Sequence, residues 1–363
     1  MKIKIMKKRH TKENFATYLG VILAFAAIQV LQNQGLLTRS FRGLLIPICC
    51  YIVMAISLNL TVGILGELSL GHAGFMSVGA FSGVVAAMSL REAIAFAPLR
   101  LAVAMVVGAI FAAIAGVLVG VPVLRLRGDY LAIVTLAFGE IIKELINCLL
   151  IGHDGSGLHL VFNFNGSKGV NDLHLAQDGI VIIKGAQGAT GTQTIATFTA
   201  GFVLILIALA VVLNLIHSRS GRAIMAIRDN RIAAESVGIN ITKYKLIAFV
   251  TSAALAGSAG ALYGLNYSNL LATKFDFNTS ILVLVFVVLG GLGNIWGSVV
   301  AAAVLTILPE ALRGFDDYRM LVYAIVLILV MLATNNERSR AFLLSLRRKL
   351  FGFAFRKGGT HNG

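Results

Sequence analysis

Long apolar runs dominate this 363-residue chain and constrain its fold more than any other feature. A helix that crosses the hydrocarbon core of a bilayer, roughly 30 Å thick, needs about 20 mostly apolar residues. The chain is 58% hydrophobic and 13% charged, against roughly 45–50% and about 25% in soluble domains. A single water-soluble globule is therefore excluded. The predicted membrane spans are residues 15–31, 43–65, 68–90, 96–124, 130–151, 195–216, 246–267, 281–308 and 318–333.

The basic residues, which give a net charge of +15, predict how the spans are oriented. Lys and Arg collect in short cytoplasmic loops of membrane proteins. Residues 1–14 and 217–245 carry six basic residues each, and the tail 335–363 is also basic, so we expect all three in the cytoplasm. The Gly-rich segment 152–194 is expected outside, and residues 15–334 form the transmembrane domain. The tail is predicted to form a basic amphipathic helix on anionic lipid, so the net positive charge of the chain requires no nucleic-acid partner.

The number of spans conflicts with the basic tail, because nine simple crossings would leave the tail outside. The best candidate for a broken span is 281–308, whose 28 residues would reach about 42 Å as one helix. Its centre, 290–297, contains four glycines, which make a continuous helix costly. We therefore predict two half-helices that enter and leave at the same face, with the loop 310–317 outside.

A second Gly-rich interruption occupies residues 63–74 and has a similar composition. Two such breaks in corresponding halves point to a transport site at the interface between repeats. Small residues can equally serve to let helices pack closely. The sequence leaves both interpretations open.

The cytoplasmic segment contains a short helix with a signal at each end. Asn230 can cap its start and Gly238 can end it in a left-handed conformation, leaving about two turns between them. Arg231 and Glu235 are four residues apart and are expected to pair on one face, while Ala233 and Val237 share another. The pattern fits a rigid helix that inserts into a cleft of a soluble partner, or an amphipathic helix at the lipid surface.

Three polar residues inside the apolar runs are candidates for a translocation path: His72, Glu140 and Asn294. Charged groups within spans usually face protein or water. Glu140 could line the path, although an ion pair with Lys143 three residues later is the favoured interpretation. For His72, in the first Gly-rich break, a packing role is favoured over substrate binding. Ser57, Asn59 and Asn214 are expected to form hydrogen bonds between helices.

Sequence signatures of enzymatic chemistry are missing. There is no GxxxxGK[ST] phosphate-binding loop, no HExxH and no GxSxG, so the chain cannot hydrolyse ATP through a P-loop of its own. The three cysteines, Cys49, Cys50 and Cys148, lie in apolar runs without metal-ligand spacing. We expect no catalytic, cofactor or metal site, and an intramembrane enzyme is disfavoured.

Three sequence blocks resemble the branched-chain amino acid permease family in its LivM-like branch. They are LRLRGDYLAIVTL at 124–136, the segment from Gly221-Arg222-Ala223 to Gly238-Ile239-Asn240, and Gly290-Gly291-Leu292-Gly293 with Trp296-Gly297. The likeness covers about residues 44–332. The stretch 233–238 also looks like the EAA-type loop through which permeases of ABC importers contact their ATP-binding subunits.

The resemblance implies an all-α, polytopic permease of an ATP-driven importer with about 8–10 spans, some broken or re-entrant. It further implies two ATP-binding subunits that bind the ATP, a second homologous permease and an extracytoplasmic substrate-binding protein, in the bacterial inner membrane. Branched-chain amino acids are the expected substrates. A stand-alone secondary transporter or channel, and an ABC permease for urea or short amides, remain alternatives. In this arrangement the coupling residues would be Arg231, Ala233, Ala234, Glu235 and Gly238.

Overall fold

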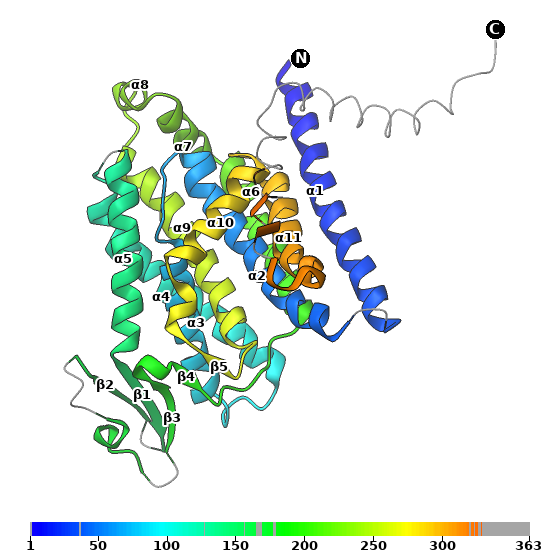
Figure 1. The fold of residues 1–363 in the computed structure, drawn as a ribbon. Helices are drawn as coiled ribbons and strands as arrows, with labels where there is room; N and C mark the ends of the chain where they lie inside the picture. The colour runs from blue at the N-terminus through cyan, green and yellow to red at the C-terminus, as the bar shows by residue number, and fades with distance from the viewer. Residues whose placement is uncertain are drawn as a thin grey trace. The chain divides into compact units, whose positions relative to one another are not determined.

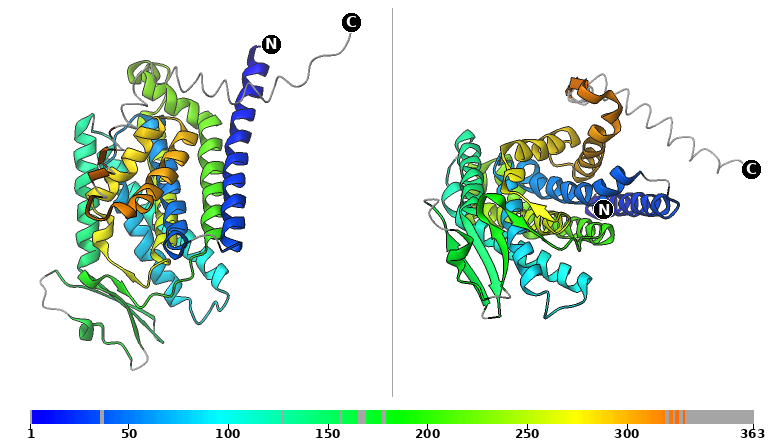
Figure 2. Two further views of the ribbon diagram at one scale, coloured as in Figure 1. Left: turned by 45° about the vertical axis from the view of Figure 1, so that its right-hand side comes forward. Right: turned by 60° about the horizontal axis from the view of Figure 1, so that its bottom comes forward.

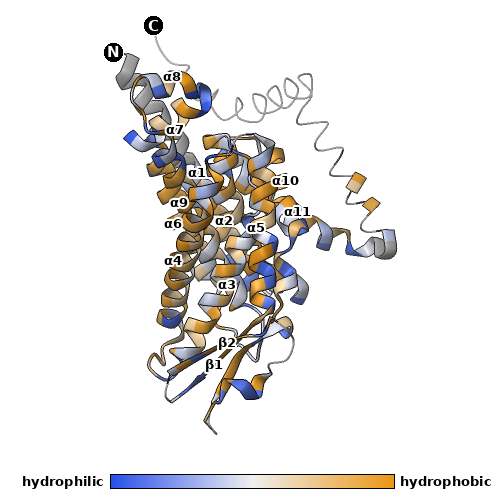
Figure 3. Cartoon of the chain, turned by 90° about the vertical axis from the view of Figure 1, so that its left-hand side faces the viewer, coloured by the Kyte–Doolittle hydropathy of each residue, from blue (hydrophilic) through white to orange (hydrophobic). Residues whose placement is uncertain are grey.

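The computed structural model describes residues 2–318 apart from 36–37, 127, 156, 165–168 and 177–178, together with 321–322, 324–325 and 328. Within these residues, seven helical segments are long and apolar enough to cross a membrane. Hydrophobic residues run along these helices (Figure 3). The segments are α2 (Arg39–Asn59) with the π-helical η1 (Leu60–Leu65), α3 (His72–Ser89), α4 (Ala97–Val123), α6 (Phe198–His217), α9 (Ile241–Gly264), α10 (Phe277–Gly290) with the preceding η4 (Ala272–Phe275), and α11 (Ile295–Ala311).

Two further helices differ from the predicted spans. Helix α1 (Lys2–Asn33) contains a shorter apolar stretch, Thr17–Gln32. Helix α5 (Asp129–Asn147) stops four residues before the predicted end at residue 151, because a strand begins at Leu149. The predicted span 318–333 lies largely, and the tail 335–363 entirely, outside the described residues. The chain divides into two compact units, 1–306 and 307–363, and the contacts discussed below lie in the first.

Helices α3, α4 and α9 form the most extensively packed part of the bundle. Their contacts are made by small residues. A Cβ on Gly79 would lie 2.1 Å from the carbonyl oxygen of Gly257, and a Cβ on Gly257 would lie 2.5 Å from that of Gly108. Without a hydrophobic driving force between helices in lipid, such close backbone approach is what favours their association.

A five-stranded sheet follows α5, in the order β2-β1-β3-β4-β5. Strand β1 (Leu149–Asp154) pairs antiparallel with both β2 (Gly157–Phe162) and β3 (Ile180–Lys184). The short strands β4 (Ala189–Thr190) and β5 (Asn269–Leu270) complete it. These strands were not predicted from the sequence, because they are short and interrupted by glycines. The sheet lies at one end of the bundle (Figures 1 and 2).

Residues 217–245 begin at the other end of the bundle. They include α7 (Arg219–Asp229) and α8 (Arg231–Ser236), and Figure 1 places α8 opposite the strands. That residues 152–194 and 217–245 lie on different sides of a membrane stays a prediction.

Candidate functional site

The predicted short helix is present with both of its end signals. The side chain of Asn230 caps α8, with its Oδ1 atom accepting from the backbone N of Ala233 at 3.1 Å. Gly238 has a φ of 82°, and the backbone N of Ile239 donates to the carbonyl of Ala234 at 3.1 Å. A left-handed glycine followed by this bond is a common way to end a helix. The sequence therefore predicted α8 to within one residue.

Helix α8 buries one side and exposes the other. Ala234 is buried, in a small cluster with Ile227 of α7 and Ile241 of α9. Ile232 and Val237 are 81% and 74% exposed, and Ala233 and Glu235 are also exposed. Two large apolar side chains held open to the surroundings on a capped helix are typical of an interaction surface.

The predicted pairing of Arg231 with Glu235 is wrong, since no ion pair joins them in the part of the chain that the structure describes. Arg231 instead lines a cavity of about 220 Å³, together with Glu67, Arg228 and Lys245. The spacing of four residues does place Arg231 and Glu235 on the same face of α8. The Arg231 side chain, however, lies toward the bundle, away from Glu235.

Two basic side chains connect this segment to the first Gly-rich break. Arg228, near the end of α7, donates from Nη1 to the carbonyl oxygen of Gly63 at 3.2 Å. Lys245 of α9 forms an ion pair with Glu67, and its side chain is 4% exposed. Neither contact was predicted from the sequence, because the partners are far apart along the chain.

The two Gly-rich breaks meet each other. The first consists of η1 and the irregular residues 66–71, and the second is the turn between α10 and α11. A Cβ on Gly63 would lie 2.2 Å from the backbone N of Gly293. Asn59 bridges both sides: its Oδ1 accepts from Gly293 N at 2.8 Å and its Nδ2 donates to Ser298 Oγ at 2.8 Å. The expectation that Asn59 bonds between helices is confirmed.

The chain turns sharply between α10 and α11, which confirms that residues 281–308 are not one continuous helix. A Cβ on Gly297 would lie 1.8 Å from the carbonyl oxygen of Gly290, whereas seven residues of helix would separate the two by about 10 Å. The turn uses positive φ angles at Gly291 and Gly293. Asn294, exposed at this turn, accepts from Gly297 N at 3.2 Å and so caps α11.

His72 lies at the start of α3 and is 2% exposed. Its Nε2 atom is 2.8 Å from Ser57 Oγ. The Ser57 hydroxyl donates to the carbonyl of Met54, so its oxygen is left to accept from the imidazole. These contacts support the favoured packing role, and they confirm that Ser57 bonds between helices.

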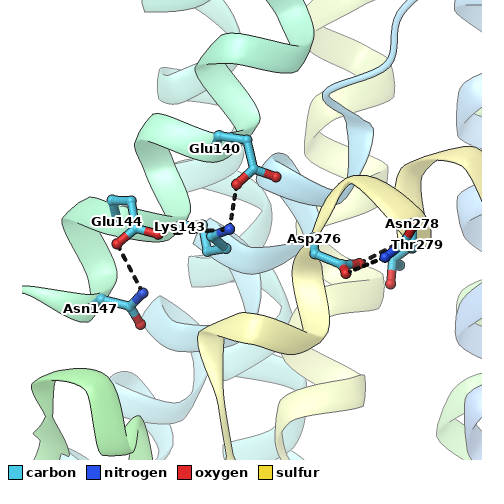
Figure 4. A network of polar contacts seen from close by, with 7 residues as sticks. All are labelled: Glu140, Lys143, Glu144, Asn147, Asp276, Asn278 and Thr279. Carbon is cyan, nitrogen blue, oxygen red and sulfur yellow. Dashed lines mark hydrogen bonds and ion pairs between the residues drawn. The ribbon is translucent and has the colours of Figure 1, made fainter.

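Glu140 forms the predicted ion pair with Lys143 on α5. Figure 4 shows that Glu144 extends this group, with its Oε1 3.7 Å from Lys143 Nζ. Asp276, which caps α10 by accepting from Thr279 N at 3.0 Å, lies opposite. The carboxylate of Asp276 points toward Asn278 and Thr279, so the polar groups of α5 and of the start of α10 form two neighbouring sets (Figure 4).

The structure assembles the predicted coupling residues on one short element but does not join the three path candidates. Within the described residues, no hydrogen bond or ion pair links His72, Glu140 and Asn294. Their role in a translocation path stays a prediction. In the same part of the chain, no three His, Cys, Asp or Glu side chains gather in a group that could hold a metal ion.

These features define a polytopic helical membrane protein with two broken helices in contact and an exposed, capped helix at one end. The model of the family described as "Branched-chain amino acid transport system / permease component" matches residues 40–331. The chain belongs to this family.

Several curated relatives are similar to the chain. It is 34% identical over 288 residues to the high-affinity branched-chain amino acid transport system permease protein LivM of Salmonella typhimurium and, equally, to that of Escherichia coli K12. Each match covers 78% of this chain and 66% of the relative. The ribose import permease protein RbsC of Escherichia coli K12 is 30% identical over 34% of this chain and 40% of its own length. No solved structure matches.

Proposed function

We propose that this chain is the membrane-spanning permease subunit of an ATP-driven importer in the bacterial inner membrane. Its partners are two ATP-binding subunits, a second homologous permease and an extracytoplasmic substrate-binding protein. The chain itself holds no cofactor, and ATP is bound and hydrolysed by the partner subunits. Family membership supports the class of transporter.

The observation that carries this proposal is the geometry of α8. It is short, capped at both ends and anchored by the buried Ala234, and it presents Ile232, Glu235 and Val237 outward. The apolar pair supplies contact area and Glu235 supplies a charge that can select a partner.

Branched-chain or related amino acids are the proposed substrates. The relatives that match 78% of the chain are named for branched-chain amino acid transport, whereas the ribose permease matches 34% of it. These amino acids are zwitterions with apolar side chains, and the charged groups of α5 and α10 are candidates for contact with such a solute (Figure 4).

In the proposed cycle, closure of the ATP-binding subunits displaces α8. Because α8 is packed on α7 and α9, the displacement tilts the attached helices. The path then opens first to the outside and later to the inside. The chain transmits a movement and performs no chemical step.

Co-purification from detergent-solubilised membranes tests this proposal. We expect a Walker-motif ATPase to come down with the tagged chain, and the charge reversal Glu235→Arg to release it and stop uptake while the protein still inserts. The matched control is Glu92→Arg, the same reversal at an exposed position between α3 and α4. Normal uptake by Glu235→Arg at normal membrane abundance would refute the assignment of α8, and ATP-free transport by the purified chain would favour a secondary transporter.

A further inference from the structure

We infer that Arg228 is a positioning residue that connects α8, the proposed coupling helix, to both Gly-rich breaks, so that movement of α8 reaches the two broken helices together. This inference rests on the proposed function, because it requires that α8 is moved by an ATP-binding subunit. Arg228 lies outside α8 itself, near the end of α7.

Arg228 lies at the junction between α8 and the bundle. It precedes the Asn230 cap of α8 by two residues and belongs to the end of α7. Its guanidinium donates to Gly63 O at 3.2 Å from Nη1, and from Nη2 to Asp229 Oδ1 at 3.0 Å. Its aliphatic part covers Gly66, where a Cβ would lie 2.7 Å from Arg228 Cγ. One side chain therefore holds both ends of the Gly63–Gly66 stretch.

The acceptor is a carbonyl of the π-helical segment η1. A π-helical turn departs from the regular α-helical bonding pattern and often occurs at functional positions. A hydrogen bond from a cation to a backbone carbonyl is stronger than one between neutral groups. Arg228 is thus well suited to fix the position of η1 relative to α7.

The contact between η1 and the α10–α11 turn is closely packed and leaves little room for the two segments to move separately. Gly63 packs backbone to backbone against Gly293, and Asn59, one turn earlier, is hydrogen-bonded to both Gly293 and Ser298. Closely packed backbone transmits displacement because there is no side chain to change rotamer. A shift of η1 must therefore carry the α10–α11 turn with it.

The ion pair of Lys245 with Glu67 provides a second connection to the first break, from helix α9, which follows α8 in the sequence. Arg228 and Lys245 flank the coupling helix in sequence, and both reach residues of the first break. Between them lies the cavity of about 220 Å³, which Arg231 also lines. The break is held at two points and has free volume beside it, as expected for a segment with two arrangements.

The test compares transport with ATP hydrolysis in the reconstituted complex of permease and ATP-binding subunits. For Arg228→Ala we expect the ATPase to remain bound and active, while the amount of substrate transported per ATP falls about tenfold, within the range of known coupling free energies. Arg228→Lys keeps a cation that can reach one carbonyl and is expected to restore part of the ratio. A merely structural role would lower transport and hydrolysis together and leave the ratio unchanged.

The matched control is Arg222→Ala, on the same helix, because Arg222 donates to His217 O and not to either break. It is expected to keep the wild-type ratio. An unchanged ratio in Arg228→Ala, with the ATPase bound, would overturn the inference and leave the proposed function standing. If the wild-type complex transports without ATP, the proposed function fails and the inference fails with it.

Discussion

Gly63 shows at the scale of one residue how a missing side chain can determine the packing of two helices. It sits where η1 meets the turn between α10 and α11. A Cβ there would lie 1.9 Å from Asn59 Oδ1 and 2.2 Å from Gly293 N. Both atoms take part in the bridge between the breaks, so added volume has to push the backbone apart.

We predict that Gly63→Ala lowers the free energy of unfolding of the detergent-solubilised protein by about 1–3 kcal/mol. Overpacking against backbone atoms cannot be relieved by a rotamer change, so the unfolding temperature falls. The measurement is the midpoint of thermal unfolding. Gly43→Ala is the control, because Gly43 lies on the preceding helix α2 and a Cβ there meets nothing within 4 Å. Equal midpoints for the two variants would show that the contact between the breaks is loose.

At the scale of the element, α8 depends on its caps more than any other helix near the site. Six residues make too little internal hydrogen bonding to hold a helix by themselves. Stability comes from the Asn230 cap, the Gly238 terminus and the burial of Ala234. The outward faces of Ile232 and Val237 exist only while that short helix is formed.

Removing the Asn230 cap should therefore weaken binding of the ATP-binding subunit, although the outward side chains of α8 are unchanged. We predict that Asn230→Ala, which costs about 1 kcal/mol of helix stability, weakens binding of the ATP-binding subunit roughly fivefold. The matched control is Asn240→Ala, which removes the cap of the 24-residue α9, a helix held by packing. A titration of the solubilised permease with the ATPase measures both. Loss of affinity in the control equal to that in Asn230→Ala would argue against a cap-dependent surface.

Elements with local signals were predictable, and those assembled from distant segments were not. Asn230 and Gly238 predicted α8, and the four glycines of 290–297 predicted the interrupted helix, because caps and helix breakers act over a few residues. The partners of Glu67 and of Asn59 lie far away along the chain, at Lys245 and at Gly293 and Ser298, so the sequence did not identify them. The sheet was missed for a related reason, since β5 comes from beyond α9 and its partner β4 has two residues.

At the scale of the whole molecule, α8 and the sheet occupy opposite ends of the bundle (Figure 1). This separation fits a cytoplasmic contact at one end and an extracytoplasmic one at the other. Labelling of single cysteines with a membrane-impermeant reagent tests it. Cys49 and Cys50 are buried, so a Cys148→Ser background removes the remaining partly accessible thiol.

We predict that Ile232→Cys is labelled from the cytoplasmic side, and that Leu160→Cys on β2 is labelled from the outside. Both positions are well exposed. Arg313→Cys, in the loop 310–317, should also react from the outside if α10 and α11 return to the face they entered. Cytoplasmic labelling at Arg313→Cys would show instead that residues 281–308 cross the membrane. The tail 335–363 would then lie outside the cell.

The contact between the two breaks also limits how this chain can vary by mutation. Where two side chains meet, loss of volume on one can be compensated by gain on the other. A Cβ on Gly63 would meet the side chain of Asn59 and also the backbone N and Cα atoms of Gly293, and no substitution removes those backbone atoms. A damaging substitution at Gly63 therefore cannot be compensated by a second substitution at Gly293. Arg228, in contrast, can be replaced by another hydrogen-bond donor of similar length.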